Sequence, residues 1–472
     1  MHSMTMENIA RACGGTFYGD SGALSREVTG VVIDSRQVQK DFLYIAMRGE
    51  RVDGHRFIPD VFAKGAAAVI SEEILDDPAG PYILVDSCPQ ALKDIAEFYR
   101  STLTIPIVGI AGSVGKTSTK EMISAVLAQK LCVLKTEGNF NNEIGLPLTL
   151  LRIRPEHEAA VVEMGISDFG EMHRLAKMAR PDICVMTNIG QCHLENLIDR
   201  DGVLHAKSEM FDYLRPDGVI VLNGNDDKLD IIEEKNGVRP VRYFVEDGTV
   251  LSPEHDCFVT ADSIANHGVK GMEAVLHFHG EDAEDCPVCE PIPGLHNIYN
   301  ACAAACVGDA LGLSHAEICA GIAHAGTIEG RTNLIETGGI VIIDDCYNAN
   351  PVSMRASLDV LAHTEGRQIA VLGDMGELGQ DERALHRAVG AYAAGKGIDR
   401  IFCTGTLSEE IVNGAMPACA AEHFDDVDAL LAPLLSYIKK GDAILVKASH
   451  FMKYSVIVAA LQKAAEDRSF NM

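Results

Sequence analysis

A glycine-rich segment followed by a lysine and two hydroxyl residues occupies residues 109–118 and reads Gly-Ile-Ala-Gly-Ser-Val-Gly-Lys-Thr-Ser. The apolar run before it predicts a buried strand, and apolar residues at helical spacing after it predict a helix. In such a strand–loop–helix segment, backbone N–H groups and the positive end of the helix bind phosphate oxygens. The spacing departs from the strict phosphate-loop pattern, because Ile110 stands where the first glycine is expected. On this segment alone, a glycine-rich turn with a lysine nearby by chance remains the alternative.

The side chains of this loop are of the types that bind a nucleotide and its metal ion. Lys116 is expected to reach the outer phosphates, and the Thr117 hydroxyl is expected to bind Mg²⁺. The residues predicted to contact the nucleotide in this loop are Gly112, Ser113, Gly115, Lys116, Thr117 and Ser118.

Polar side chains also follow two other apolar runs. Glu163 ends the run that begins at Ala159, and His193 comes shortly after the run 182–187. The carboxyl ends of parallel strands meet at one edge of a sheet, so both residues are expected near the phosphate loop. Mg²⁺ prefers oxygen ligands, which favours Glu163 as a ligand, and His193 can complete the site or bind its water. Alone, each has a simpler interpretation as a solvated strand end or a structural histidine.

The start of an alanine-rich helix near residue 295 carries two asparagines. Asn297 and Asn300 are three residues apart and therefore lie on one helical face. Their amides can read the edge of a nucleotide base.

The elements that position these residues form three units. Residues 1–103 read as a small α/β domain, with Arg36 and His55 near strand ends, where a ligand site and a plain surface are both possible. In residues 104–326 strands alternate with helices, which predicts a doubly wound parallel sheet. The pattern restarts in residues 327–472 and predicts a Rossmann-like third domain. The fold class is therefore α/β.

Composition and charge restrict the partners. The chain has 472 residues, too many for one core, and its formal net charge of −28 argues against a nucleic-acid partner. No apolar run approaches the length of a membrane span and the first residues do not resemble a signal peptide, so we expect a cytoplasmic protein without a membrane partner. The 14 cysteines are scattered, which is typical of buried thiols in a reducing compartment.

One group of metal-ligand types falls outside this scheme. His277, His279, Cys286 and Cys289 permit a zinc site, because zinc binds both imidazole and thiolate. The alternation around the two histidines fits one exposed face of a strand equally well.

Several segments together resemble the Mur ligases, a family of ATP-dependent amide-bond-forming enzymes of peptidoglycan precursor synthesis. The resemblance covers about residues 30 to 450, and the motifs occur in the family's order. Beside the phosphate loop, they are Thr136 to Pro147, Glu163-Met164-Gly165, Thr187 to Gly190 with His193-Leu194-Glu195, Ala206 to Glu209, Gly294 to Asn297, Gly330-Arg331, Tyr347 to Pro351 and Leu372 to Gly379.

Within the family, these segments are most similar to the member that joins D-alanyl-D-alanine to UDP-N-acetylmuramoyl-tripeptide. The resemblance implies ATP and Mg²⁺ as cofactors, a monomer, and an acyl phosphate on the tripeptide carboxylate. It implies Thr117, Glu163, His193 and Lys207 as metal ligands, with Lys207 carbamylated. For the nucleotide it implies Asn297 at adenine, Arg331 at the γ phosphate, Asp345 at ribose, and Asn348. As substrate-binding residues it implies Ser35, Arg36, Asp53, His55, Asn141, Asn142, Asn350, Lys447 and His450.

The last motif departs from the family pattern. His450 stands where the family has an arginine, and Ser455 stands where a glutamate is expected. Arginine is always charged and binds carboxylates in a bidentate manner, whereas histidine is mostly neutral at pH 7. Two alternatives therefore stay open: a ligase of the same architecture with a different acceptor amine, and a nucleotide-binding regulator that performs no ligation. The sequence does not distinguish lysine from diaminopimelate in the tripeptide.

Overall fold

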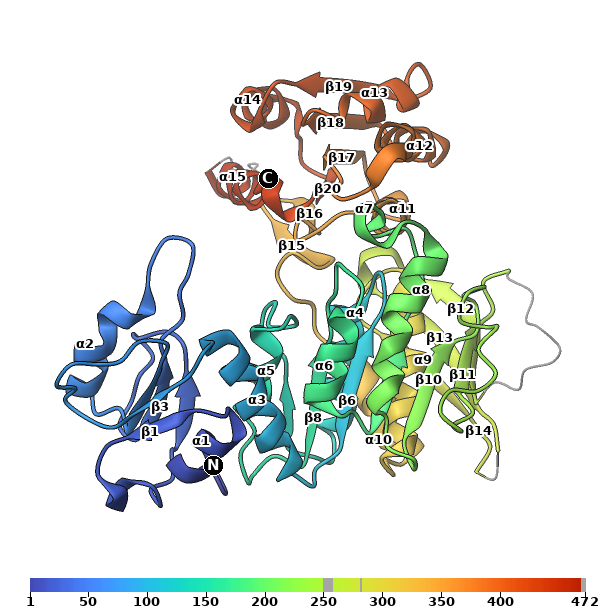
Figure 1. The fold of residues 1–472 in the computed structure, drawn as a ribbon. Helices are drawn as coiled ribbons and strands as arrows, with labels where there is room; N and C mark the ends of the chain where they lie inside the picture. The colour runs from blue at the N-terminus through green and yellow to red at the C-terminus, as the bar shows by residue number, and fades with distance from the viewer. Residues whose placement is uncertain (249–257, 281, 468–472) are drawn as a thin grey trace.

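The computed structural model describes residues 1–248, 258–280 and 282–467 and contains three β-sheets, one for each predicted domain (Figure 1). The predicted limits at 103/104 and 326/327 fall between the sheets, since β5 ends at Leu84, β6 begins at Ile107, β14 ends at Glu290 and β15 begins at Asn333. The residue limits themselves stay predictions. No helix within the described ranges is long and apolar enough to cross a membrane.

The first domain is a five-stranded sheet in the order β1-β5-β4-β3-β2. Strands β2 to β5 are parallel to their neighbours in the sheet, and only β1 runs antiparallel, against β5. Its strands are β1 (Thr16–Tyr18), β2 (Gly30–Val32), β3 (Phe42–Ile45), β4 (Ala68–Ser71) and β5 (Tyr82–Leu84). Its helices are α1 (Met6–Ala12), α2 (Ile58–Ala63) and α3 (Cys88–Ser101).

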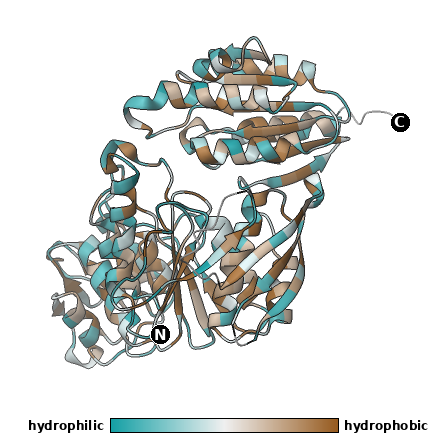
Figure 2. Cartoon of the chain, turned by 90° about the vertical axis from the view of Figure 1, so that its right-hand side faces the viewer, coloured by the Kyte–Doolittle hydropathy of each residue, from teal (hydrophilic) through white to brown (hydrophobic). Residues whose placement is uncertain are grey.

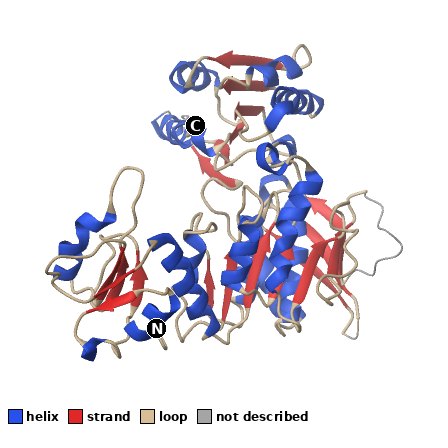
Figure 3. Ribbon diagram, viewed as in Figure 1, coloured by secondary structure: helices blue, strands red, loops and turns tan. Residues whose placement is uncertain are grey.

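The central domain has a nine-stranded sheet in the order β14-β13-β12-β11-β10-β9-β6-β8-β7, with helices on both faces (Figure 3). Its strands are β6 (Ile107–Ala111), β7 (Val133–Lys135), β8 (Ala159–Glu163), β9 (Ile183–Met186), β10 (Val219–Asn223), β11 (Val241–Val245), β12 (Val259–Asn266), β13 (Met272–Phe278) and β14 (Glu284–Glu290). Its helices are α4 (Lys116–Leu127), α5 (Gly145–Leu150), α6 (Glu171–Ala179), α7 (Leu194–Leu197), α8 (Arg200–Ser208), α9 (Leu295–Ala310) and α10 (His315–Ala323).

The predicted parallel sheet is confirmed from β7 across to β12, and two antiparallel strands extend it. Strand β13 pairs antiparallel with both β12 and β14. The pattern of residues 250–292 is less regular than that of the rest of the domain, and residues 250–257 and 281 lie outside the described residues. Strand β13 alternates buried and partly exposed residues, which is the pattern of a sheet covered on one face.

The third domain has six strands in the order β15-β16-β20-β17-β18-β19, of which only β15 is antiparallel to its neighbour. This confirms the predicted Rossmann-like repeat. Its strands are β15 (Asn333–Thr337), β16 (Ile340–Asp344), β17 (Gln368–Gly373), β18 (Arg400–Thr404), β19 (Ala420–Phe424) and β20 (Ala443–Lys447). Its helices are α11 (Pro351–Ala362), α12 (Glu382–Gly395), α13 (Glu409–Ala415), α14 (Val427–Tyr437) and α15 (Ser455–Asp467).

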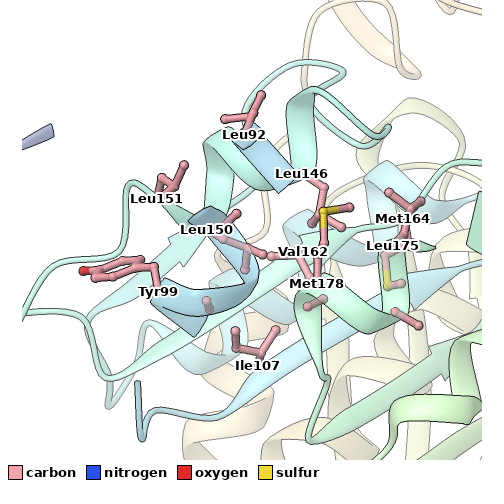
Figure 4. Close-up of a cluster of buried hydrophobic side chains, with 14 of the residues drawn as sticks. Leu92, Tyr99, Ile107, Leu146, Leu150, Leu151, Val162, Met164, Leu175 and Met178 are labelled. Carbon is pink, nitrogen blue, oxygen red and sulfur yellow. The ribbon is translucent and has the colours of Figure 1, made fainter. Parts of the chain in front are cut away.

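One hydrophobic core joins the first domain to one face of the central sheet. Leu92 and Tyr99 of α3 belong to the same buried cluster as Leu146 and Leu150 of α5 and Met178 of α6 (Figure 4). Hydrophobic residues are concentrated along the strands throughout the molecule (Figure 2). Burying one leucine side chain stabilises a fold by about 1.5–3 kcal/mol, so this shared core fixes the first domain against the central one.

The edge of the central sheet where β6, β8 and β9 end faces the third domain (Figure 1). The phosphate loop follows β6 at this edge, and the helix α4 begins directly after it. The expected gathering of polar strand ends therefore lies between two domains.

Candidate active site

The phosphate loop has a backbone conformation that requires glycine at two positions. Gly115 has φ +85° and precedes α4, whose first turn has no side-chain cap. A Cβ on Gly112, where φ is +150°, would lie 2.0 Å from Thr187 Oγ1. The loop therefore lies directly against the end of β9. Uncapped N–H groups at the start of α4 are free to bind an anion.

The residues that follow β9 hold the loop in place. Asn188 accepts a hydrogen bond from the Val114 N–H at 3.0 Å and donates one to the Val114 carbonyl at 2.9 Å. The Lys116 ammonium group donates to the Gly112 carbonyl at 2.8 Å, across the loop. These contacts fix the loop before any ligand binds, which lowers the entropy cost of binding.

The predicted magnesium ligands Thr117 and Glu163 are in contact. The Thr117 hydroxyl donates to Glu163 Oε2 at 2.9 Å, and Asn141 Nδ2 donates to Glu163 Oε1 at 2.8 Å. Glu163 is only 3% exposed, at the end of β8. A buried carboxylate beside a hydroxyl and the phosphate loop is the oxygen donor set that Mg²⁺ takes.

His193 meets the third domain. Its Nδ1 lies 2.5 Å from Glu377 Oε2, which joins the domains across the cleft. Burial lowers the pKa of His193, and Glu377 opposes that shift.

Lys207 lies near the end of α8 and is 1% exposed. Burial lowers the pKa of Lys207 to about 8, with Cys192 opposing the shift and Lys116 adding to it. Lys207 therefore lies near Lys116 of the phosphate loop and near Cys192, both of which line the first cavity described below.

A cavity of about 740 Å³ lies between the central and third domains. Its walls include residues of the phosphate loop, Asn141 and Asn142 from the segment before α5, and residues from three loops of the third domain. Of the predicted site residues, the structure brings Ser113, Gly115, Lys116, Thr117, Asn141, Asn142, Glu163, His193, Arg331, Asn348, Asn350 and His450 together around it.

A second cavity, of about 270 Å³, lies on the other side of the loop. It shares Gly115, Thr117 and Arg331 with the first cavity, and its lining adds four polar residues that the sequence analysis singled out. These are Ser118, Asn300, Asp345 and Lys447.

Asn297 does not line either cavity among the described residues. Its Nδ2 donates to the Pro293 carbonyl at 2.9 Å, and its Oδ1 accepts from Asn300 Nδ2 at 2.9 Å. Asn300 lines the second cavity and also accepts a hydrogen bond from Thr119. The two amides thus share one helical face, as expected, but Asn300 is the one at the cavity, and adenine contact by Asn297 stays a prediction.

Asp345 and Lys447 form a buried ion pair in the second cavity. Lys447 Nζ lies 2.6 Å from Asp345 Oδ2, and the side chains are 2% and 10% exposed. Burial lowers the pKa of Lys447, against the effect of Asp345. Asp345 follows β16 and Lys447 is the last residue of the neighbouring β20, and the register of the two strands places Asp344 opposite Val446.

The four predicted residues of the first domain lie apart from both cavities. Arg36 pairs with Asp34 and its side chain is 87% exposed, with Ser35 beside it. His55 Nδ1 lies 2.7 Å from Asp53 Oδ1, while His55 Nε2 accepts the N–H of Glu72 at 3.1 Å. Asp53 and His55 therefore support the local backbone, and a substrate role for all four stays a prediction.

Three cleft residues were missing from the predicted site. Asn188 holds the loop, and Tyr347 lies under Arg331, whose guanidinium carbon is 4.2 Å from the ring centre. Glu377 pairs with His193. All three belong to motifs visible in the sequence, but nothing in the motif that contains Glu377 indicates its contact with His193.

The fold and the site define a three-domain α/β protein with a phosphate-binding loop at a cleft between its central and third domains. Family models of the Mur ligases match all three parts: the catalytic domain at residues 27–100, the middle domain at 110–308 and the glutamate ligase domain at 330–450.

Relatives and solved structures agree with this assignment over nearly the whole chain. The chain is 36% identical over 469 residues to UDP-N-acetylmuramoyl-tripeptide–D-alanyl-D-alanine ligase of Bacillus subtilis, covering 98% of this chain and 99% of the relative. The structure of MurF from Acinetobacter baumannii matches with a TM-score of 0.87 at 30% identity, over 97% of this chain and 98% of that one. MurF ligase from Thermotoga maritima in complex with ADP matches with a TM-score of 0.79 at 28% identity, over 93% and 98%. The chain belongs to the Mur ligase family.

Proposed function

We propose that this protein joins D-alanyl-D-alanine to UDP-N-acetylmuramoyl-tripeptide, with conversion of ATP to ADP and phosphate, in the cytoplasmic synthesis of peptidoglycan precursors. The observation that carries the proposal is the cleft in which Lys116, Thr117 and Glu163 of the central domain face Arg331 of the third domain. The relative from Bacillus subtilis, named for this reaction, spans nearly the same length and supports the choice of substrates.

The second cavity suits the nucleoside part of ATP, since it lies beside the loop and is lined by Asn300 and Asp345. From there the phosphates extend over the start of α4. Lys116 and the N–H groups of α4 neutralise their charge, and Arg331 contacts the γ phosphate from the third domain. Arg331 lines both cavities, which supports a role at the point where the two proposed ligands would meet.

Thr117, Glu163 and His193 are the residues that would hold Mg²⁺, and a carbamate on Lys207 would add oxygen ligands. The donor set fits, because the Glu163 carboxylate and the Thr117 hydroxyl are already in contact at the phosphate loop. Bound there, the ion would neutralise charge on the phosphates.

The larger cavity suits the tripeptide end and the acceptor. The terminal carboxylate oxygen of the tripeptide attacks the γ phosphorus, ADP leaves, and an acyl phosphate forms. The acceptor amine then attacks the acyl carbon, the bond to the phosphate oxygen breaks, and phosphate leaves while the amine loses a proton. The protein contributes positioning and charge neutralisation, and it forms no covalent bond to the substrate. The first domain, with Ser35, Arg36, Asp53 and His55, is proposed to bind the UDP-sugar end.

One observation favours an acceptor amine other than D-alanyl-D-alanine. His450 lines the larger cavity, its ring centre 5.5 Å from that of Tyr347, at the position where the family has an arginine. If that position binds the acceptor carboxylate, a histidine binds it more weakly than an arginine does.

The test measures ADP release with ATP, Mg²⁺ and UDP-N-acetylmuramoyl-tripeptide, with and without D-alanyl-D-alanine, and identifies the amide product by mass. Lys116→Ala is the inactive control. Release that requires both substrates supports the proposal. Activity only with another amine would select the alternative acceptor, and tight ATP binding without release for any acceptor would refute ligation.

A further inference from the structure

Four metal-binding side chains converge at the far end of the central sheet, away from the cleft. Glu284 and Cys286 are two residues apart on β14 and therefore point to the same face of the strand. His315 and Cys319 are four residues apart on α10 and lie on one side of that helix. Because α10 packs on β14, the two pairs face one another.

The ligand atoms are already close together. One carboxylate oxygen of Glu284, the Cys286 sulfur and one ring nitrogen of His315 all lie within 4.8 Å of one another. His315 Nδ1 is 2.8 Å from Glu284 Oε2. The thiol of Cys319 interacts with that of Cys286 but does not belong to the group of atoms within 4.8 Å of one another, so it becomes a fourth donor only after its side chain rotates toward them.

The imidazole of His315 is held in its orientation by two further groups. The ring of Phe278 stacks on it, with centres 3.9 Å apart and planes 16° apart. Asp309 Oδ1 lies 3.8 Å from Nε2, on the opposite side of the ring from Glu284. Histidines that bind metals usually donate their other N–H to a carboxylate, which fixes the tautomer. The side chain of His315 is only 10% exposed, whereas that of Glu284 is 60% exposed, so the site lies at the surface with its imidazole buried.

We propose that Glu284, Cys286, His315 and Cys319 bind one divalent ion of the zinc class in a tetrahedral site. Two thiolates, an imidazole and a carboxylate are zinc ligands, whereas Mg²⁺ takes oxygen ligands. Zn–S and Zn–N distances of about 2.3 and 2.0 Å require ligand atoms roughly 3.4–3.8 Å apart. Binding therefore requires side-chain rotations that shorten the present separations to that range. Each thiol loses its proton on binding.

This set differs from the one that the sequence suggested. His277 and Cys286 belong to opposite faces of the hairpin, because Cys286 pairs with Leu276 and His277 pairs with Asp285. His277 lies between Asp262 and Asp285, at 3.0 and 2.7 Å. The zinc site of His277, His279, Cys286 and Cys289 is therefore wrong, and only Cys286 takes part in the new one.

A metal ion here would join the antiparallel extension of the sheet to the helix layer behind the phosphate loop. Helix α10 packs closely on α4, since a Cβ on Gly321 would lie 2.4 Å from the Val126 Cα. The α4 helix begins at the phosphate loop. The site is thus a structural one, and its ion takes no part in the reaction.

The experiment titrates the metal-free full chain with Co²⁺ and then Zn²⁺, without nucleotide, and follows thiolate-to-Co²⁺ charge-transfer absorption. We expect saturation at one ion per chain and displacement by Zn²⁺. Cys286→Ser, Cys319→Ser and His315→Ala should each weaken Zn²⁺ binding at least about 100-fold, and Asp309→Asn about 10-fold. The matched control is Cys289→Ser, an exposed thiol on the same strand, which should bind as the wild type does.

Circular dichroism shows whether each variant is folded, and alkylation followed by mass spectrometry gives a second readout. Zn²⁺ should protect Cys286 and Cys319 from alkylation in the wild type but leave Cys289 reactive. Absence of charge-transfer absorption, or absorption that survives Cys286→Ser, would overturn the proposal.

Discussion

The buried pair of Lys447 and Asp345 allows a quantitative test of how the third domain is held together. Replacing Lys447 by methionine keeps most of the side-chain volume and removes the cation. The Asp345 carboxylate then stays buried with two neutral donors, the Ser357 hydroxyl at 2.5 Å and the Thr332 N–H at 3.3 Å.

The expected loss in free energy of unfolding follows from these contacts. Breaking a buried ion pair by removing one partner typically costs about 3–5 kcal/mol, whereas an exposed pair contributes about 0–1 kcal/mol. Because Asp345 keeps two donors, we expect Lys447→Met to cost about 3 kcal/mol, at the lower limit. Asp345→Asn should cost a similar amount, since the ammonium group of Lys447 keeps the Asn348 carbonyl at 3.1 Å. The double variant should lose less than the sum, by about 2 kcal/mol of coupling.

The assay is urea unfolding of the full chain, with a reporter confined to the third domain. The chain contains no tryptophan, so Phe424→Trp, placed on β19 in all four proteins, reports this domain alone. The free energy of unfolding is compared across the wild type, both single variants and the double variant. Additive losses, or single losses below about 1 kcal/mol, would refute a buried and coupled pair.

Three further outcomes are expected. Glu163→Gln should slow ADP release about 100-fold or more, with partial recovery at high Mg²⁺, because weaker charge neutralisation costs about 3 kcal/mol; an unchanged rate would contradict the metal assignment. Gly112→Ala should weaken nucleotide binding at least about tenfold, because its Cβ would lie 2.0 Å from Thr187 Oγ1. Calorimetric titration measures this, with Gly326→Ala, which has no atom within 4 Å of its Cβ, as the control. Burial raises the pKa of Glu290 to about 8 from its ordinary 4.5. The unfolded chain loses this proton at lower pH than the folded chain does, so the free energy of unfolding should fall as the pH rises between these two values, by up to about 1.4 kcal/mol per pH unit. Glu290→Gln should remove that slope in denaturation curves recorded from pH 5 to 9, and equal slopes in both proteins would exclude the effect.

Features that depend on a short stretch of chain were predictable from the sequence. The phosphate loop needs only a strand, a turn and a helix, and residues 105–127 carry all three patterns. Glu163 was predictable for a related reason, since parallel strands end at one edge of a sheet and β6 pairs with β8. The strand offered as the alternative around His277 is β13, but its pairing with β14 was not predicted, because Pro287 lies inside β14 and interrupts the strand pattern there.

Helical spacing predicted correctly that Asn297 and Asn300 share a face, but it does not say which of them meets a ligand. Asn297 is closer to the Pro293 carbonyl, which occupies its amide. Asn300 lies one turn further along, where the third domain completes the wall of the second cavity. That wall is built by residues such as Asp345 and Lys447, far away in the chain, so no pattern within the helix contains the information.

The cleft itself depends even more on contacts between distant parts of the chain. His193 comes from the central domain and Glu377 from the third, and their contact depends on how the two domains pack. Glu377 occupies only Nδ1 of that imidazole and leaves Nε2 for an ion, and a carboxylate on the other ring nitrogen fixes the orientation of a metal-binding histidine. Because Glu377 belongs to the third domain, the contact links a metal site at His193 to the domain that carries Arg331.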